Sequence, residues 1–297
     1  SEVSKILDEN DFSDYDAVIG PVEERNFDRV ASTLKRDMIP VIAPFSSPKE
    51  LYSNVFQTIP ENKLLQDAML KFVKSDSLQK QIIIIADQSH RTVSNNLKSA
   101  LPTAKQIFSE INKKTGKDDF FIYPVNLNSL IGNGKTVVFL ETDNNAMASS
   151  VISMLNGLIS EDKEIVLVTL DKNKAFEGKN IDNNYLSNLQ FHYPSVNRSF
   201  DEKSTNGFVE AYRKEYGVSP SRYATRGFDL TMDVLLRLAS GESLFDASNE
   251  MIETEYIENK FRYSKSLFGG YKNEAVYIVK YEDLQIVEVK PSDKILN

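Results

Sequence analysis

The segment QIIIIAD at residues 81–87 constrains the fold most, because it contains four isoleucines in a row. A strand with one face in the core and one in water would carry a polar residue at every second position. An unbroken isoleucine run therefore predicts a strand buried on both faces, which is typical of parallel sheets covered by helices on each side. KTVVFLET (135–142) and EIVLVTLD (164–171) have the same character. Helical patterns separate the three, so the sequence predicts a doubly wound α/β fold.

Weaker signals extend this alternation over the rest of the chain. Apolar residues recur at helical spacing within 27–34 and 63–76. The segment 269–289 predicts two antiparallel strands joined by a turn at Glu282–Asp283. Further strands are predicted over 14–21, 39–44, 56–60, 120–125 and 189–196, and further helices over 93–113, 147–158, 199–217 and 226–241.

The composition bounds the class of protein. The 297 residues suit two lobes, and 41% hydrophobic with 26% charged residues predict a chain that forms a core. The net charge of −8 disfavours a phosphate backbone as partner, so we expect no nucleic acid. The absence of cysteine excludes disulfides, thiolate metal sites and cysteine nucleophiles.

Neither a membrane span nor a secretion signal is visible in the sequence. No apolar run approaches the ~18 residues that a helix needs to cross a bilayer. The first residues, SEVSKILDEN, lack the basic and apolar regions of a signal peptide. We therefore expect either a cytoplasmic protein or one whose export signal lies outside this chain.

Three longer segments, in this order, carry a family resemblance. They are DAVIGPVEERNFDRVASTLKRDMIPVIAPFSSP (16–48), GFVEAYRKEYGVSPSRYATRGFDLTMDVLLRLASG (207–241) and FRYSKSLFGGYKNEAVYIVKY (261–281). The first two resemble the cleft-lining strands and the late helix pair of type I periplasmic binding proteins, including the substrate-binding proteins of amino-acid ABC transporters. The third is similar to the C-terminal hairpin of Bacteroidetes envelope proteins that join LysM peptidoglycan-binding repeats to such a domain.

This resemblance implies two Rossmann-like lobes with mostly parallel sheets. Lobe 1 would comprise 1–60 and 189–245, and lobe 2 would comprise 61–188 and 246–297. The first lobe of the family begins with a strand, a helix and a strand that have no counterpart here, and LysM repeats are absent, so we expect a fragment. The loss would leave an unpaired apolar strand edge, from which we predict a homodimer or edge capping through 16–20. A membrane would be reached only through a missing N-terminal anchor.

We expect a ligand at the carboxyl ends of the strands, in the cleft between the lobes. Ser46 and Ser47 follow the IPVIAP strand and offer hydroxyl and backbone N–H groups; the alternative is a serine turn that caps the next segment. Amino-acid-binding members of the family that the chain resembles place hydroxyl residues where Glu23 and Glu24 stand. A glutamate would repel a ligand carboxylate, so acids at a helix N-terminus account better for this pair.

Polar residues also follow three strands of the second lobe. Arg91 would pair with an acidic group of the ligand or with Glu23 or Glu24, and the alternative is a set of ordinary polar loop residues. The predicted ligand-binding residues are Ser46, Ser47, Glu23, Gln88, His90, Arg91, Asp143, Asn144 and Asp171. Asp229 matches an aromatic-Asp position of the family and is expected to cap its helix or to pair with Arg226.

The sequence contains no recognisable catalytic, metal or cofactor motif. The two histidines, His90 and His192, lack metal-ligand spacing, and no G-x-S-x-G elbow provides a nucleophile. GNGKT (132–136) lacks the first glycine of a phosphate loop and precedes a strand instead of a helix, so it predicts a turn. We therefore expect no catalysis, no metal and no cofactor.

Two functions fit these observations best. The first is a non-catalytic receptor domain of the periplasm or cell envelope that binds a solute or a cell-wall (peptidoglycan) fragment. The second is an envelope scaffold that kept the binding-protein fold and uses it for protein contacts. The effector domain of a cytoplasmic regulator would need a helix-turn-helix before residue 1, and an enzyme would need catalytic groups that the sequence does not offer.

Overall fold

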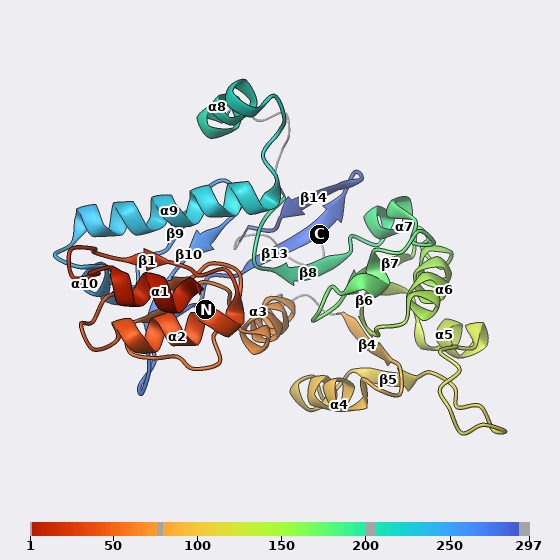
Figure 1. The fold of residues 1–297 in the computed structure, drawn as a ribbon. Helices are drawn as coiled ribbons and strands as arrows, with labels where there is room; N and C mark the ends of the chain where they lie inside the picture. Colours follow the sequence, from red (N-terminus) through yellow and green to blue (C-terminus); the bar gives the residue numbers. More distant parts are fainter. Residues whose placement is uncertain (1, 76–79, 200–205, 291–297) are drawn as a thin grey trace. The chain divides into compact units, whose positions relative to one another are not determined.

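The computed structural model describes residues 2–75, 80–199 and 206–290 and divides into two compact units (Figure 1). Unit 1 comprises Ser1–Leu64 and Val196–Val276, and unit 2 comprises Leu65–Ser195 and Tyr277–Asn297. The chain therefore passes from one unit to the other three times. Each unit has an α/β architecture with a mostly parallel sheet, as the sequence predicted.

Unit 2 is built on a seven-stranded sheet in the order β14-β13-β8-β7-β6-β4-β5. Its strands from β4 to β8 run parallel, whereas the hairpin of β13 and β14 pairs antiparallel with β8. The strands are β4 (Gln81–Ala86), β5 (Lys105–Phe108), β6 (Gly134–Glu141), β7 (Lys163–Val168), β8 (His192–Ser195), β13 (Tyr277–Glu282) and β14 (Gln285–Glu288). The helices are α3 (Asn62–Ser75), α4 (Arg91–Ala100), α5 (Pro124–Leu130), α6 (Asn145–Asn156), the short 3₁₀ helix η1 (Lys174–Phe176) and α7 (Asn183–Asn188).

The isoleucine run of β4 is buried on both faces, as predicted. Ile83 and Ile85 belong to the core that α5, α6 and α7 cover, whereas Ile84 belongs to the core under α3 and α4. All three side chains are fully buried. Full burial of an isoleucine contributes roughly 1.5–3 kcal/mol, so this strand anchors both layers of unit 2.

Unit 1 contains a five-stranded sheet in the order β1-β2-β3-β12-β11. Val41 faces the layer of α1 and α2, whereas Ile42 and Phe56 face the layer of α9 and α10. The strands are β1 (Val18–Ile19), β2 (Val41–Ala43), β3 (Val55–Gln57), β11 (Tyr263–Lys265) and β12 (Tyr271–Asn273), with a separate pair β9 (Thr254–Glu255) and β10 (Lys260–Phe261). The helices are α1 (Glu2–Glu9), α2 (Glu24–Leu34), α8 (Gly207–Tyr216), α9 (Arg222–Ser240) and α10 (Leu244–Asn249).

The segment 246–276 lies in unit 1, whereas the sequence-based boundaries placed it in the second lobe. Its strand β12 pairs in parallel with β3, which brings Tyr271 opposite Phe56. Gly270 permits this approach, because a Cβ there would lie 2.1 Å from the backbone oxygen of Val55. Of the chain after residue 245, only the strands from Tyr277 onward belong to unit 2.

Two sequence-based elements differ from the structure. The predicted strand over 120–125 is not a strand, because Pro124 begins α5 and Phe121 and Tyr123 remain exposed. The edge strand β5 lies instead at Lys105–Phe108, within the region predicted as a helix over 93–113. Residues 200–205 of the helix predicted over 199–217 lie outside the described residues, and the described part forms α8.

The strand β1 lies at the edge of the unit 1 sheet. Among the described strands it pairs only with β2, through Val18 and Ile19. Pairing of residues 16–20 with a second chain stays a prediction. Among the described helices, none combines the length and the apolar composition needed to cross a bilayer.

The core of unit 1 yields a stability prediction. The Phe56 ring is fully buried and stacks on the Tyr271 ring with centroids 4.4 Å apart. Replacing Phe56 with alanine leaves a cavity, so we expect Phe56→Ala to lower the free energy of unfolding by about 3–5 kcal/mol in denaturant titrations. Phe268→Ala is the matched control, because that ring is fully exposed. Equal effects of the two substitutions would contradict this packing.

Candidate functional site

A buried aspartate organises the carboxyl end of the unit 2 sheet. Asp87 directly follows β4 and is 1% exposed. Its carboxylate accepts hydrogen bonds from Thr142 Oγ1 at 2.7 Å, Ser89 N at 2.9 Å and His90 N at 3.0 Å. Burial alone would raise the pKa of Asp87, but hydrogen bonds from His90, Ser89 and Thr142 outweigh it and hold the pKa well below its usual range. Asp87 is therefore a fixed negative charge.

His90 lies between two carboxylates. Its Nδ1 is 2.7 Å from Asp87 Oδ1, and its Nε2 is 3.7 Å from Asp143 Oδ1. The hydrogen bond with Asp87 raises the pKa of His90, burial opposes this, and the charges of Asp87 and Asp143 add to it. Asp143 is 73% exposed and accepts a 2.6 Å hydrogen bond from Asn173 Nδ2. The His90 ring thus links the buried carboxylate of Asp87 to the solvent-exposed carboxylate of Asp143.

Two further carboxyl groups complete this cluster. Glu141 ends β6, is 3% exposed and accepts a 2.9 Å hydrogen bond from Leu170 N. Burial raises the pKa of Glu141 to about 8, so this side chain is largely protonated at neutral pH. Burial, followed by the charge of Asp143, raises the pKa of Asp171. We call Asp87, His90, Glu141, Asp143 and Asp171 the strand-end cluster.

The other predicted residues of unit 2 make local contacts instead. Arg91 Nε donates to Gln88 Oε1 at 2.6 Å, and the Arg91 guanidinium lies 4.3 Å from the centre of the Phe108 ring on β5. Gln88 N donates to Asp118 Oδ2 at 2.7 Å. Asn144 caps α6 by accepting a hydrogen bond from Met147 N at 3.0 Å. Of the predicted set, the structure therefore brings together His90, Asp143 and Asp171.

The predicted ligand-binding residues of unit 1 lie at two places: Glu23 precedes α2, and Ser46 and Ser47 follow β2. Glu23 precedes α2 and accepts from Arg25 Nε at 3.0 Å and Asn26 Nδ2 at 2.7 Å, which fits acids at a helix N-terminus. Ser47 Oγ accepts from Gln57 Nε2 at 3.5 Å. Ser46 Oγ is buried without a hydrogen-bond partner among the described residues.

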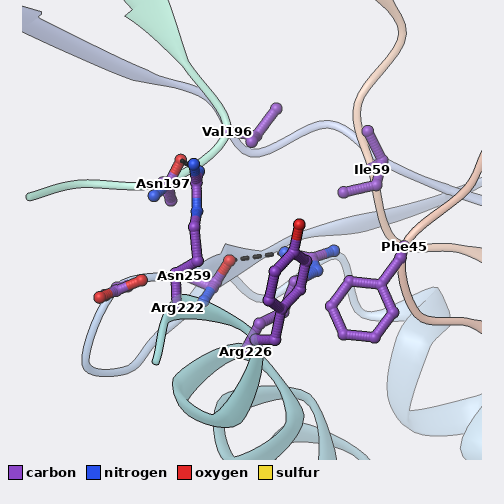
Figure 2. Close-up of a pocket in the computed structure, with 9 residues that line it drawn as sticks. Phe45, Ile59, Val196, Asn197, Arg222, Arg226 and Asn259 are labelled. Atoms are coloured by element: carbon purple, nitrogen blue, oxygen red, sulfur yellow. Dashed lines mark hydrogen bonds between the residues drawn. The ribbon is translucent and has the colours of Figure 1, made fainter. Parts of the chain in front are cut away.

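Unit 1 also contains a pocket of about 220 Å³ that the sequence did not reveal (Figure 2). The expected pairing of Asp229 with Arg226 is not formed as an ion pair: Asp229 accepts hydrogen bonds from the backbone N–H groups of residues 257–259, and Arg226 donates to Pro44 O and to Asn259. The pocket is lined by Phe45, Ile59, Val196, Asn197, Arg222, Tyr223, Arg226, Glu258 and Asn259. The spacing of Arg222 and Arg226 by one helical turn was the available sequence signal.

The geometry around His90 differs from that of a nucleophilic triad. Such a triad places the serine on one imidazole nitrogen and the carboxylate on the other. Here Ser89 Oγ lies 3.1 Å from Nδ1, the same nitrogen that contacts Asp87, and Nε2 faces Asp143. The last three residues of the GNGKT segment already belong to β6 (Gly134–Glu141), so a strand, and not the helix of a phosphate loop, follows Asn133. Within the described residues, no group of three or more His, Asp and Glu side chains is arranged to hold a metal ion.

Comparison with known proteins supports the fold from an independent direction. No family model matches the sequence, and no curated protein matches it. An ABC-type branched-chain amino acid transporter protein from Rhodopseudomonas palustris matches 99% of this chain and 82% of its own, with 15% identity and a TM-score of 0.57. A branched-chain amino acid periplasmic ligand-binding protein from Burkholderia xenovorans matches 97% and 81%, with 11% identity and a TM-score of 0.56.

LpoA from Haemophilus influenzae matches 97% of this chain with 11% identity and a TM-score of 0.54, and the match covers 51% of LpoA. The chain therefore has the two-lobed, mostly parallel α/β fold of type I periplasmic binding proteins. The likeness to LysM-containing envelope proteins of Bacteroidetes stays a prediction.

Because the sequence contains only two histidines, the protonation of His90 can be followed by NMR. We expect His90 to titrate above the ordinary value of about 6.5, and Asp87→Asn to lower its pKa. Because the folded pKa is raised, the stability that protonated His90 contributes is complete below about pH 6.5 and is lost as the pH rises through the folded pKa. His192 is the internal control, since burial lowers its pKa to about 3. An unchanged His90 titration in Asp87→Asn would contradict the proposed contact.

The raised pKa of Glu141 predicts that the stability of the folded chain depends on pH, and it fixes the direction of that dependence. Its raised pKa means that the folded chain keeps a proton that the unfolded chain releases, so stability falls as the pH rises from about 4.5 to about 8. We expect Glu141→Gln to remove this loss, with a slope change of up to about 1.4 kcal/mol per pH unit in denaturant titrations. Glu161→Gln on the exposed surface is the control. Parallel pH profiles of Glu141→Gln and the original chain would overturn this assignment.

Proposed function

We propose that this chain is a non-catalytic ligand-binding domain of an extracytoplasmic receptor, located in the periplasm or cell envelope, that binds a small solute. The strand-end cluster carries the proposal. In open α/β sheets, ligands bind outside the carboxyl ends of the strands, which is where Asp87, His90 and Asp143 lie.

The energetic state of the strand-end cluster supports a binding role. Keeping Glu141 buried and Asp171 partly desolvated works against the charged form of both side chains. Ionisable groups with shifted pKa values collect at functional sites, and convergent polar groups orient small ligands. The exposed Asp143 is the group that would contact a solute first.

The fold neighbours suggest which solutes to test first. The Rhodopseudomonas palustris and Burkholderia xenovorans proteins are named for branched-chain amino acids. Soluble peptidoglycan fragments are the second class, following the resemblance to envelope proteins. The position of a ligand between the two lobes stays a prediction.

A thermal-shift screen with the protein amino acids, simple sugars and soluble muropeptides tests this function. A ligand that binds only the folded chain stabilises it by about 2.7 kcal/mol at a concentration of 100 Kd, so we expect at least one compound to raise Tm. Asp143→Asn should weaken that compound's affinity about tenfold or more, because it removes the exposed charge of the cluster.

The control is Asp162→Asn, an exposed aspartate that precedes β7 at the opposite end of the strands. It should leave the affinity unchanged. Failure of all three compound classes to stabilise the chain would contradict solute binding and favour the scaffold function.

A further inference from the structure

Two adjacent apolar side chains in unit 1 are almost completely exposed to solvent. Leu267 is 93% exposed and Phe268 is 101% exposed, whereas the next large apolar side chain in the described part of the chain, Val125, is 70% exposed. The two residues occupy the tip of the hairpin of β11 and β12, which projects from unit 1 as a narrow blue turn (Figure 1). Single exposed apolar residues are common on protein surfaces, but an adjacent, fully exposed pair indicates a contact surface.

The base of this turn is fixed against the sheet. Gly270 N donates to Leu51 O at 3.1 Å. A Cβ on Gly269 would lie 2.5 Å from Leu51 O, and a Cβ on Gly270 would lie 2.1 Å from Val55 O, so larger residues would not fit there. The next residue, Tyr271, already pairs with β3. The apolar tip is therefore held outward by its own supports, away from the core of unit 1.

The turn lies at the end of the sheet opposite to the unit 1 pocket. Strands β2, β3 and β12 run parallel, and the turn 266–270 directly precedes β12, so it stands at their amino ends. Phe45 and Ile59 of the pocket follow β2 and β3, at the carboxyl ends. A contact made by the turn is therefore separate from the pocket.

The charges around the tip are positive within the hairpin itself. The segment 262–273 contains three basic residues and no acidic residue. Two of them, Arg262 and Lys272, form ion pairs with acids of neighbouring segments, which neutralises both partners. Lys265 is exposed, and its ammonium lies 5.8 Å from the centre of the Tyr271 ring. The tip thus carries a cation directly beside its apolar pair.

The loop that supports the turn adds a second cation and a third apolar side chain. The backbone oxygen of Tyr52 would lie 2.4 Å from a Cβ on Gly270, so Tyr52 stands at the base of the turn. The ammonium of Lys35, which is exposed, lies 5.3 Å from the centre of the Tyr52 ring. Met38 is 46% exposed, and its sulfur accepts a hydrogen bond from Ser53 Oγ at 3.8 Å. Apolar and cationic groups therefore lie together at this end of the sheet.

This combination fits a lipid surface better than a protein partner. Two side chains on a projecting turn cover far less than the ~1,200–2,000 Å² that a stable protein–protein interface buries. A lipid surface needs no matching cavity, and aromatic and aliphatic side chains next to lysines are typical of proteins that lie on one side of a membrane. The positive charge beside the tip favours anionic headgroups.

We propose that the β11–β12 turn is a membrane-contact site that inserts Leu267 and Phe268 into the headgroup region of a bilayer containing anionic lipids, with Lys265 at the level of the phosphates. The sequence predicted a membrane contact only through an N-terminal anchor, whereas this one uses residues of the folded unit. The contact goes beyond solute binding and does not depend on it. A single short apolar anchor binds a bilayer weakly and reversibly, so this turn orients unit 1 at a membrane.

A fluorescent probe at the tip tests the insertion. The chain contains no tryptophan, so Phe268→Trp supplies a single emitter. With vesicles of phosphatidylglycerol and phosphatidylethanolamine, we expect the emission to shift to shorter wavelength and brominated lipids to quench it. Vesicles of neutral phosphatidylcholine should give a smaller response, because they do not attract the lysine. Tyr216→Trp, at an exposed position of α8, is the control probe and should not respond.

Sedimentation with the same vesicles tests the side chains of the original sequence. Leu267→Gln combined with Phe268→Gln should weaken binding to anionic vesicles by about tenfold or more, because both apolar side chains lose their lipid contact. Lys265→Gln should weaken it about threefold to fivefold. Leu235→Gln combined with Leu236→Gln is the matched control, since it replaces two adjacent exposed leucines on α9, and it should leave binding unchanged.

The outcomes decide the proposal without reference to any solute. The tip variants should keep the Tm of the original chain, because the replaced side chains lie outside the core. Weaker binding of the tip variant together with unchanged binding of the α9 control supports the membrane contact. Absence of binding to anionic vesicles, equal binding of the tip variant and the original chain, or a Phe268→Trp emission that vesicles leave unchanged overturns it and favours a protein partner for the turn. Equal binding to neutral and anionic vesicles overturns the preference for anionic lipids.

Discussion

Burial of the central strands on both faces is the constraint on which unit 2 depends. Ile83 and Ile85 pack into one layer and Ile84 into the other, so the middle of β4 has no face left for a polar side chain. Polar residues are therefore concentrated where the strands end. Because β4 and β6 run parallel in register, their carboxyl ends coincide, and Asp87 meets Thr142 there. The same packing that stabilises the sheet also brings charged groups into contact.

Unit 1 also brings polar groups together at its strand ends, but its strands are shorter. β2 and β3 have three residues each, so the sheet alone fixes the strand ends less firmly. Helix α9 provides the missing contacts: Arg226 binds the ends of both strands, and Asp229 binds the loop before β10. The pocket is therefore held by side-chain hydrogen bonds from one helix, whereas the strand-end cluster of unit 2 follows from backbone pairing.

The sequence predicted those parts of the fold whose signal is local. Continuous apolar runs identified β4, β6 and β7, and helical spacing identified α2 and α6. His90 was found because it follows a strand directly. The strand at Lys105–Phe108 was missed because it is an edge strand that is only partly buried, whereas the aromatic run before Pro124 suggested a strand where the chain turns into a helix.

The missed parts of the candidate sites depend on contacts between distant residues. Arg226 and Pro44 are 182 positions apart, and Arg226 and Thr58 are 168 apart, so no local spacing reports their contact. Asp87 and Glu141 were counted as strand residues, because their roles depend on the neighbouring strand ends that they meet. The role expected for Asp229 failed for the same reason: its acceptors are satisfied by a loop about 28–30 positions further on.

Because the chain crosses between the units three times, some neighbouring strands are synthesised far apart in time. Strand β8 pairs with β7, which is synthesised before it, and with β13, which leaves the ribosome only after the whole of 196–276. Strand β3 likewise waits for β12. Both sheets of the nascent chain therefore keep an open edge until residues 271–288 have been synthesised, so the two units are completed within a short stretch of chain instead of one well before the other.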